Sequence, residues 1–177
     1  MLAWNYFPFL ASLASASIAK RAIQTDVNIY AYGVGIKGLL VSADSDSLAV
    51  IADNATALAN GLTNVTWTID TAGLAPWNVT TANSSAIGQL YIVPSATEDQ
   101  QVGFSTNPPT GASTVGFVIY GSTVEYATET TFESQFYAQN SSTGVWSLMW
   151  NADSENLDDG VPVVLKTIAP ITIEATA

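Results

Sequence analysis

The chain has 177 residues, of which 48% are hydrophobic and only 11% are charged, so it can bury one sizeable core and lies far from the disordered class. It contains neither cysteine nor histidine, which excludes disulfides, thiolate catalysis and the commonest zinc ligands. Fifteen acidic residues against four basic ones give a net charge of −11, which argues against nucleic acid and anionic membranes as partners.

The first 21 residues differ in composition from the rest of the chain and predict a cleaved secretion signal. Residues 7–14 form an apolar stretch of the length found in signal peptides, which is too short to span a bilayer. The small residues at 14–16 are typical of a signal cleavage site. A buried N-terminal helix is the alternative interpretation.

Lys20 and Arg21 form a dibasic motif of the kind that kexin-type proteases cut, which predicts a mature chain beginning at Ala22. That chain, residues 22–177, is expected to form a single domain. It keeps two basic and fifteen acidic residues, a net charge of −13 that favours basic partners. No later stretch approaches the roughly 18 apolar residues of a membrane span. We therefore expect a secreted protein, extracellular or associated with the cell wall.

The predicted elements begin with three strands and a helix. Apolar residues alternate with others over 27–32, the period-two pattern of a strand with one buried face, and strands are also expected over 38–43 and 47–51. A short helix is expected over 54–60, because this segment is rich in alanine and Asp53 is placed to cap it.

The middle of the chain predicts strands separated by loops. Alternating apolar residues indicate a strand over 64–70, and strands are expected over 88–93 and 101–105. Residues 71–86 and 106–114 contain glycine, proline and polar residues, so both are expected to be surface loops.

The sequence then predicts a hairpin. Residues 117–120 and 123–126 flank a two-residue turn in which Gly121 supplies the positive φ that a type II′ turn needs. The last strands are expected over 132–138, 145–150 and 161–167. About ten short strands at this spacing predict an all-β fold with at most one short helix. We favour a two-sheet antiparallel β-sandwich, and a closed β-barrel is the alternative.

Five Asn-x-Ser/Thr sequons lie downstream of the signal, and none has proline at its middle position. They are at Asn54, Asn64, Asn78, Asn83 and Asn140. In a secreted chain such asparagines are acceptors for N-glycans, so we expect them to be exposed.

Several blocks of the sequence show a family resemblance. They are Tyr30–Gly33, Ile36–Gly38, Leu90–Ser95, Gln101–Ser105, Gly116–Gly121, Ser134–Tyr137 and Gly144–Asn151. The blocks resemble a family of small secreted ascomycete proteins that is largely uncharacterised, and the likeness covers nearly all of the predicted mature chain. Because these blocks are mostly core and turn residues, they identify a fold family and not an active site. The resemblance also implies a role at the fungal surface or in contact with a host. It implies no catalytic residues.

An acidic loop is the first of three candidate sites. Asp153, Glu155, Asp158 and Asp159 place four carboxylates between two predicted strands, and Ca²⁺ prefers such oxygen ligands. The spacing does not match an EF-hand. We favour a solvated acidic loop with no cofactor, and a Ca²⁺ site is the alternative.

Tryptophans form the second candidate site. Trp67, Trp146 and Trp150 occupy period-two positions, which favours the core over a sugar-stacking surface. Trp77 lies in the predicted loop over 71–86, beside a sequon, so it is expected to be exposed and is the candidate sugar-binding residue.

The third candidate is a carboxylate pair for glycoside hydrolysis, which requires two acids that face each other. Glu125, Glu129 and Glu133 are the available acids. Glu125 and Glu133 are expected on neighbouring strands, and alternation is compatible with both lying on the wet face of a sheet.

Together these observations predict a non-enzymatic secreted interaction protein of a filamentous fungus, at the cell surface or as an effector. Its expected partner is a basic protein surface or a cell-wall polysaccharide. A carbohydrate-binding module is the alternative, and a glycoside hydrolase is the third hypothesis.

Overall fold

The computed structural model describes residues 22–95, 98–152 and 159–171, and within these ranges the chain is almost entirely β-strand. The strands are β1 (Ile23–Val27), β2 (Tyr30–Gly33), β3 (Ile36–Ala43), β4 (Ala49–Ala52), β5 (Thr63–Asp70), β6 (Asn78–Thr81), β7 (Ala86–Tyr91), β8 (Gln100–Gln101), β9 (Gly103–Ser105), β10 (Phe117–Tyr120), β11 (Thr123–Ala127), β12 (Phe132–Glu133), β13 (Phe136–Ser142), β14 (Val145–Trp150) and β15 (Gly160–Lys166). The helix is α1 (Asn54–Ala59).

Six of the strands close into a barrel. β2 pairs with β3, β3 with β4, β4 with β14, β14 with β13, and β13 with β15, which returns to β2. All of these pairs are antiparallel, and closure leaves each barrel strand with two hydrogen-bonded neighbours. The predicted all-β fold with at most one short helix is confirmed. Its barrel corresponds to the closed architecture that was the alternative to a two-sheet sandwich.

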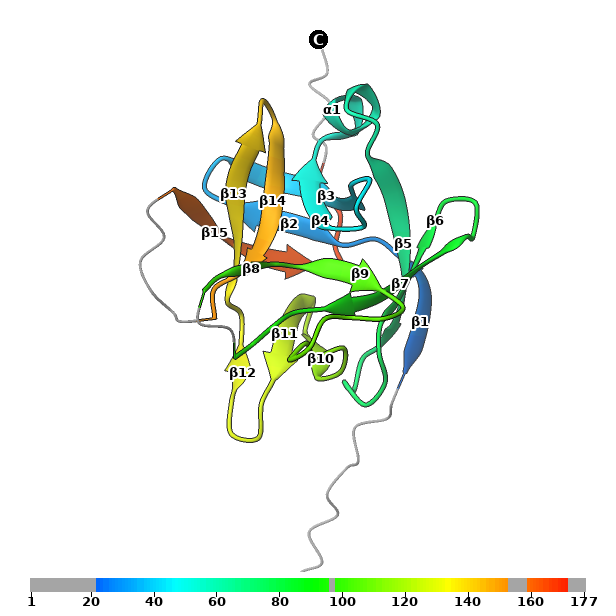
Figure 1. The fold of residues 1–177 in the computed structure, drawn as a ribbon, viewed down its shortest axis with the longest axis vertical. Coiled ribbons are helices and arrows are strands. Elements are labelled where there is room, and N and C mark those ends of the chain that lie inside the picture. Colours follow the sequence, from blue (N-terminus) through cyan, green and yellow to red (C-terminus); the bar gives the residue numbers. More distant parts are fainter. Residues whose placement is uncertain (1–21, 96–97, 153–158, 172–177) are drawn as a thin grey trace, which may run out of the picture.

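Two smaller sheets extend from this barrel. β5 pairs with β3 at one end, through Ser42–Asn64 and Ala43–Thr63, and then continues into a sheet with β1, β6, β7 and β9. β11 pairs with β15 through Thr123 and Lys166, and carries β10 and β12 on its two sides. Figure 1 shows the sheet of β10, β11 and β12 at one end of the molecule and α1 at the other.

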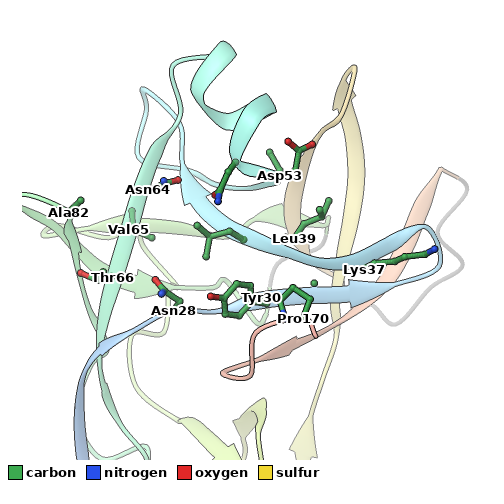
Figure 2. A pocket seen from close by; sticks show the side chains of 14 residues that line it. Asn28, Tyr30, Lys37, Leu39, Asp53, Asn64, Val65, Thr66, Ala82 and Pro170 are labelled. Atoms are coloured by element: carbon green, nitrogen blue, oxygen red, sulfur yellow. The ribbon is translucent and has the colours of Figure 1, made fainter. Parts of the chain in front are cut away.

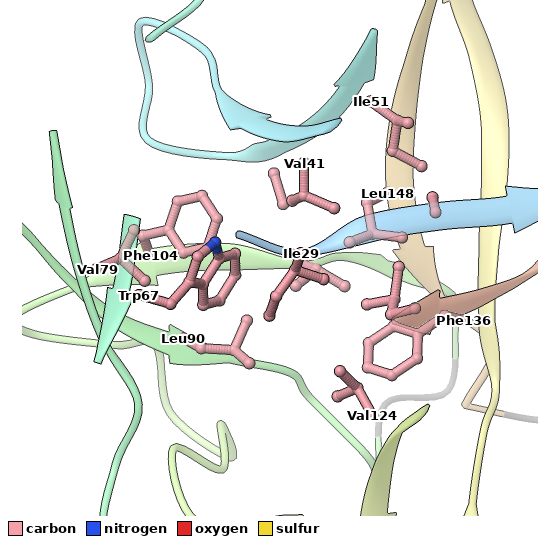
Figure 3. Packing of buried hydrophobic residues seen from close by; sticks show 14 of the residues in the cluster. Ile29, Val41, Ile51, Trp67, Val79, Leu90, Phe104, Val124, Phe136 and Leu148 are labelled. Carbon is pink, nitrogen blue, oxygen red and sulfur yellow. The ribbon is translucent and has the colours of Figure 1, made fainter. Parts of the chain in front are cut away.

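The main core is one cluster of buried side chains from the barrel strands, from the sheet of β5, β6, β7 and β9, and from β10 and β11. Trp67 packs edge-on against Phe104, with ring centroids 5.3 Å apart (Figure 3). Trp150 packs edge-on against Phe136, with ring centroids 4.9 Å apart. Both tryptophans are fully buried, and Trp146 is partly buried against the same core. The prediction that these three pack in the core is confirmed, and burial of each large side chain contributes about 1.5–3 kcal/mol to stability.

Local signals in the sequence gave the right helix and hairpin. The Asp53 carboxylate accepts hydrogen bonds from the backbone N–H groups of Ala55 and Thr56, both at 2.9 Å, and so caps α1 as predicted. β10 and β11 pair through Tyr120 and Thr123 across a two-residue turn, in which Gly121 has a φ of +65°.

The prediction of a surface loop over 71–86 is wrong in part, because this segment contains β6. Val65 pairs with Thr81 and Trp67 with Val79, so β6 lies beside the alternating strand β5. Val79 is buried, whereas Asn78 and Ala82 are exposed. A strand of four residues shows too few alternations to stand out beside the Gly, Pro and Asn residues that surround it.

Candidate functional site

Trp77, the predicted sugar-binding residue, is buried with 0% of its side chain exposed. Its indole Nε1–H donates a 2.9 Å hydrogen bond to the backbone carbonyl of Asp70. Its ring packs against the ring of Phe117, with the two ring centroids 5.8 Å apart. The Asp70 carboxylate also accepts hydrogen bonds from the N–H groups of Leu74 and Ala75. These contacts turn the segment after β5 back over the core. The prediction that Trp77 is exposed is therefore wrong.

The acids proposed for glycoside hydrolysis do not form a facing pair. β11 and β12 are neighbours, as predicted, but Glu133 pairs with Tyr126, which packs against the core, whereas Glu125 is the next residue along β11. Successive side chains of a strand point to opposite faces, so Glu125 and Glu133 lie on opposite faces of this small sheet. Glu129 is exposed in the turn between the two strands. The expectation that both acids share a wet face is corrected by this register.

Glu125 instead lies among apolar and aromatic side chains on the outer face of β10, β11 and β12. The strand pairing places Val118 opposite Glu125, Tyr120 opposite Thr123, and Phe132 opposite Ala127. Paired residues share a face, as do residues two apart in a strand, so Val118, Tyr120, Thr123, Glu125 and Phe132 all lie on one surface. We call this surface the aromatic face.

Two rings dominate the aromatic face. Tyr120 is 72% exposed and Phe132 62%, although both are large and partly apolar. Their centroids are 6.3 Å apart and their planes are inclined by 25°. Glu125 lies two residues from each of their partners on β11, between the strands that carry them. Desolvation by this partial burial raises the pKa of the Glu125 carboxyl above its ordinary value.

A second candidate surface lies on the outside of β2, β3 and β15. It is a hollow of about 500 Å³ lined by Tyr32, Lys37, Lys166, Ile168, Pro170 and Ile171, with the Ser122 side of the hairpin at its rim. We call it the lysine hollow. Lys37 and Lys166 are the only basic residues after residue 21 in the sequence, and both line it.

A larger hollow of about 580 Å³ adjoins the lysine hollow, because Lys37 and Pro170 line both. Figure 2 shows Asp53 and Asn64 toward α1, and Tyr30 and Lys37 along β2 and β3. Asn54 and Asn64, two of the sequon asparagines, are among its lining residues. We call this second hollow the amide hollow. A glycan on either asparagine would occupy it, so it is a poorer candidate for a ligand.

The five sequon asparagines are all exposed, as predicted. Asn54 and Asn64 line the amide hollow, and Asn78 and Asn83 lie in or beside β6. Asn140 pairs with Trp146 across β13 and β14 and lines a third hollow of about 630 Å³. None of these five asparagines lies on the aromatic face or lines the lysine hollow. Glycans at the sequons would leave the aromatic face uncovered, whereas the lysine hollow shares Lys37 and Pro170 with the amide hollow, where Asn54 and Asn64 lie.

Most of the acidic loop lies outside the described residues. Asp153, Glu155 and Asp158 are among the residues not described, and Asp159 is exposed. In the described part of the chain, no three metal-ligating side chains come together. The alternative of a Ca²⁺ site therefore remains a hypothesis that rests on the sequence.

One further titratable pair has a structural role. The Tyr137 hydroxyl is hydrogen-bonded to Asp99, and the pKa of this phenol is raised, first by burial and then by the neighbouring carboxylate. Asp99 also accepts a hydrogen bond from the backbone N–H of Ala152 at 3.1 Å. A phenol with a raised pKa stays protonated at neutral pH, so Tyr137 cannot act as a general base. Its hydrogen bond to Asp99 connects the segment before β8 to β13 of the barrel.

No protein-family model, curated protein or solved structure matches the chain. Its function must therefore be inferred from its own residues and their arrangement. Among the described residues, no helix has the length and apolar character required to cross a membrane.

Sequence reasoning missed both surfaces. Tyr120 was placed at the end of a predicted strand and Phe132 at the start of another, but no local pattern showed that these ends meet. The two lysines were identified as the only cations of the predicted mature chain. Their convergence depends on the pairing of β2 with both β3 and β15, which joins residues far apart in the sequence.

Proposed function

We propose that this chain is a secreted, glycosylated and non-enzymatic interaction protein of a filamentous fungus, which binds a basic protein surface through its aromatic face. In this proposal the protein acts outside the cell, at the fungal surface or on a host as an effector. It needs no cofactor, and addition of Ca²⁺ should change its melting temperature only weakly.

The observation that supports the proposal is the exposure of Tyr120 and Phe132 beside Glu125. Aromatic faces attract lysine and arginine side chains by cation–π interaction, and a nearby carboxylate adds charge complementarity. Burial already disfavours the charged form of Glu125, so a cation that pairs with this carboxylate would offset that cost. The strongly acidic chain would also steer a basic partner toward the protein.

The sequon positions support the same surface. Glycans on the five exposed asparagines would shield the amide hollow, the region of β6 and the third hollow, whereas the aromatic face contains no sequon. An exposed apolar pair on an unshielded surface is typical of an interaction site.

A carbohydrate-binding module is the second candidate, because two exposed and nearly parallel rings also suit the apolar faces of pyranose sugars. The candidate residues for that function are now Tyr120 and Phe132, since Trp77 is buried. A glycoside hydrolase has less support, because Glu125 and Glu133 point to opposite faces of their sheet.

The test is a titration of the mature protein with an octapeptide of alternating lysine and glycine, followed by two-dimensional NMR. A matched peptide with serine in place of lysine is the control ligand. We expect shifts confined to the aromatic face and a loss of binding as salt is raised. Tyr120→Ala and Phe132→Ala are each expected to weaken binding about two- to fivefold, the range for an exposed cation–π contact.

The control variants separate the local surface from general effects. Leu58→Ala removes a side chain that is 84% exposed on α1, and Asp46→Asn removes one exposed acid away from the aromatic face. Neither should change binding as Tyr120→Ala or Glu125→Gln does. Equal effects of Asp46→Asn and Glu125→Gln would contradict a specific site.

Two other outcomes would replace the proposal. Salt-independent retention on insoluble wall polysaccharide, lost in Tyr120→Ala, would make the protein a carbohydrate-binding module. Release of reducing sugars from fungal or plant wall, lost in Glu125→Gln or Glu133→Gln, would make it an enzyme.

A further inference from the structure

The lysine hollow brings together the only two basic side chains that follow residue 21. Lys37 is on β3 and Lys166 on β15, and β2 lies between these strands and pairs with both. No carboxylate lines this hollow among the residues that the structure describes. In a chain where acids outnumber bases by fifteen to four, this is a local reversal of charge.

The residues around the lysines are held in place. Lys166 Nζ lies 5.4 Å from the centre of the Tyr32 ring, and the Tyr32 hydroxyl donates a 2.8 Å hydrogen bond to the carbonyl of Ile168. Pro170 packs at Gly38, whose φ is +75°; a Cβ there would lie 2.8 Å from Pro170 Cβ and 2.9 Å from the Tyr32 hydroxyl. The chain after β15 is thus fastened across the outside of β2 and β3.

The rest of the lining is largely apolar and open to solvent. Ile168 is 58% exposed and Ile171 is 89% exposed, and both line the hollow with Pro170. The volume of about 500 Å³ lies within the range of small-molecule sites, in which an apolar lining is combined with a few polar groups. The lining of the hollow therefore combines two positive charges with apolar contact surface.

We propose that the lysine hollow binds an amphipathic monocarboxylate, with its carboxylate between Lys37 and Lys166 and its apolar body against Ile168, Pro170 and Ile171. A polyanion is a poorer occupant, because repulsion by the acidic chain grows with the charge of the ligand, whereas a single carboxylate meets the least repulsion. This proposal does not depend on the function proposed above, which concerns a different surface.

The experiment uses sodium decanoate as the probe, added to the mature protein at pH 7.5 and followed by two-dimensional NMR of backbone and lysine side-chain signals. Decanol has the same apolar body without charge, and decylamine reverses the charge. We expect saturable shifts at Lys37, Lys166, Ile168 and Ile171 with decanoate. Decanol should bind at least threefold more weakly, and decylamine should not compete. Binding should also fall when the pH is lowered below the pKa of the carboxyl group, at about 4–5.

Substitutions of the two lysines test whether their positive charges bind the carboxylate of decanoate. Lys37→Gln and Lys166→Gln should each weaken decanoate binding about two- to fivefold, the usual range for a partly exposed ion pair. Lys166→Arg keeps the charge and should restore binding. The double variant Lys37→Gln/Gln139→Lys keeps the net charge but moves the cation to an exposed position on β13, and should bind as weakly as Lys37→Gln.

Three results would overturn the proposal. The first is equal affinity for decanol and decanoate, and the second is undiminished decanoate binding in Lys37→Gln/Lys166→Gln. The third is binding of an oligogalacturonate at this hollow with no binding of decanoate, which would assign the hollow to acidic polysaccharide.

Discussion

Replacement of Trp77 by alanine tests whether this residue is structural or a ligand contact. The side chain is fully buried, donates a hydrogen bond to the Asp70 carbonyl and packs against Phe117. Truncation of a buried tryptophan costs about 3–5 kcal/mol, through lost contacts and the cavity left behind. For a domain of this size each kcal/mol lowers the melting temperature by about 2–4 °C, so Trp77→Ala should lower it by about 6–20 °C.

The assay is urea unfolding followed by circular dichroism, with two comparison variants. Trp77→Phe keeps a ring near Phe117 but loses the N–H donor, and should cost about 1–2 kcal/mol. Tyr120→Ala removes an aromatic ring that is 72% exposed, and should change the free energy of unfolding by less than about 0.5 kcal/mol. Wild-type stability of Trp77→Ala, together with lost retention on wall polysaccharide, would refute the structural assignment.

Three further predictions concern maturation and titration. Mass spectrometry of protein from culture medium should show a chain that begins at Ala22 and loses mass on deglycosylation; a retained Met1 or an unchanged mass would contradict this. Asp53→Ala should lower stability at pH 7, because the pKa of this capping carboxyl is lowered by its hydrogen bonds to Thr56; the difference should disappear as the pH falls through that lowered pKa. Glu125→Gln should slightly raise stability at pH 7, because burial raises the pKa of Glu125 and penalises its charged form. Urea titrations at pH 7, and at a pH below the pKa that Glu125 has in the unfolded chain, should show that this gain vanishes at the lower pH.

Features that depend on neighbouring residues could be predicted from the sequence. The cap at Asp53 needs only the N–H groups two and three residues later, and the turn at Gly121 needs only a residue that tolerates positive φ. Burial of Trp67 and of Trp150 followed from the alternation of residues along the strand to which each belongs. Exposure of the sequon asparagines was expected from their role as glycan acceptors in a secreted chain.

Features that depend on distant pairing could not be predicted. Closure of the barrel requires β15 to pair with β2, and β4 to pair with β14, across long stretches of chain. No single-sequence pattern specifies such partners, because strand pairing depends on which faces and edges meet in the folded chain. Burial of Trp77 depends on the turn that Asp70 organises. This turn is not apparent from the sequence, in which Trp77 stands between Pro and Asn and was therefore assigned to a surface loop.

The two proposed binding surfaces meet at the hairpin between β10 and β11. Ser122 lines the lysine hollow, and Thr123 on the aromatic face pairs with Lys166. The backbone N–H of Thr167 also donates a 3.0 Å hydrogen bond to the Ser122 carbonyl, which fixes the turn against the end of β15. Lys166 therefore lies beside the aromatic face, and its charge acts through space on a ligand bound there.

If both proposals hold, the two ligands should strengthen each other's binding. Lys37 and Lys166 repel a basic peptide on the aromatic face, and a carboxylate bound between them would offset one of these two positive charges. Two unit charges about 10 Å apart in water interact by about 0.4 kcal/mol, so saturating decanoate should raise peptide affinity about twofold at low salt. By linkage the peptide must raise decanoate affinity by the same factor. Titrations in both orders measure the two factors, and Lys37→Gln/Lys166→Gln should remove the coupling. Coupling that persists in this variant would show that the surfaces do not communicate through these lysines.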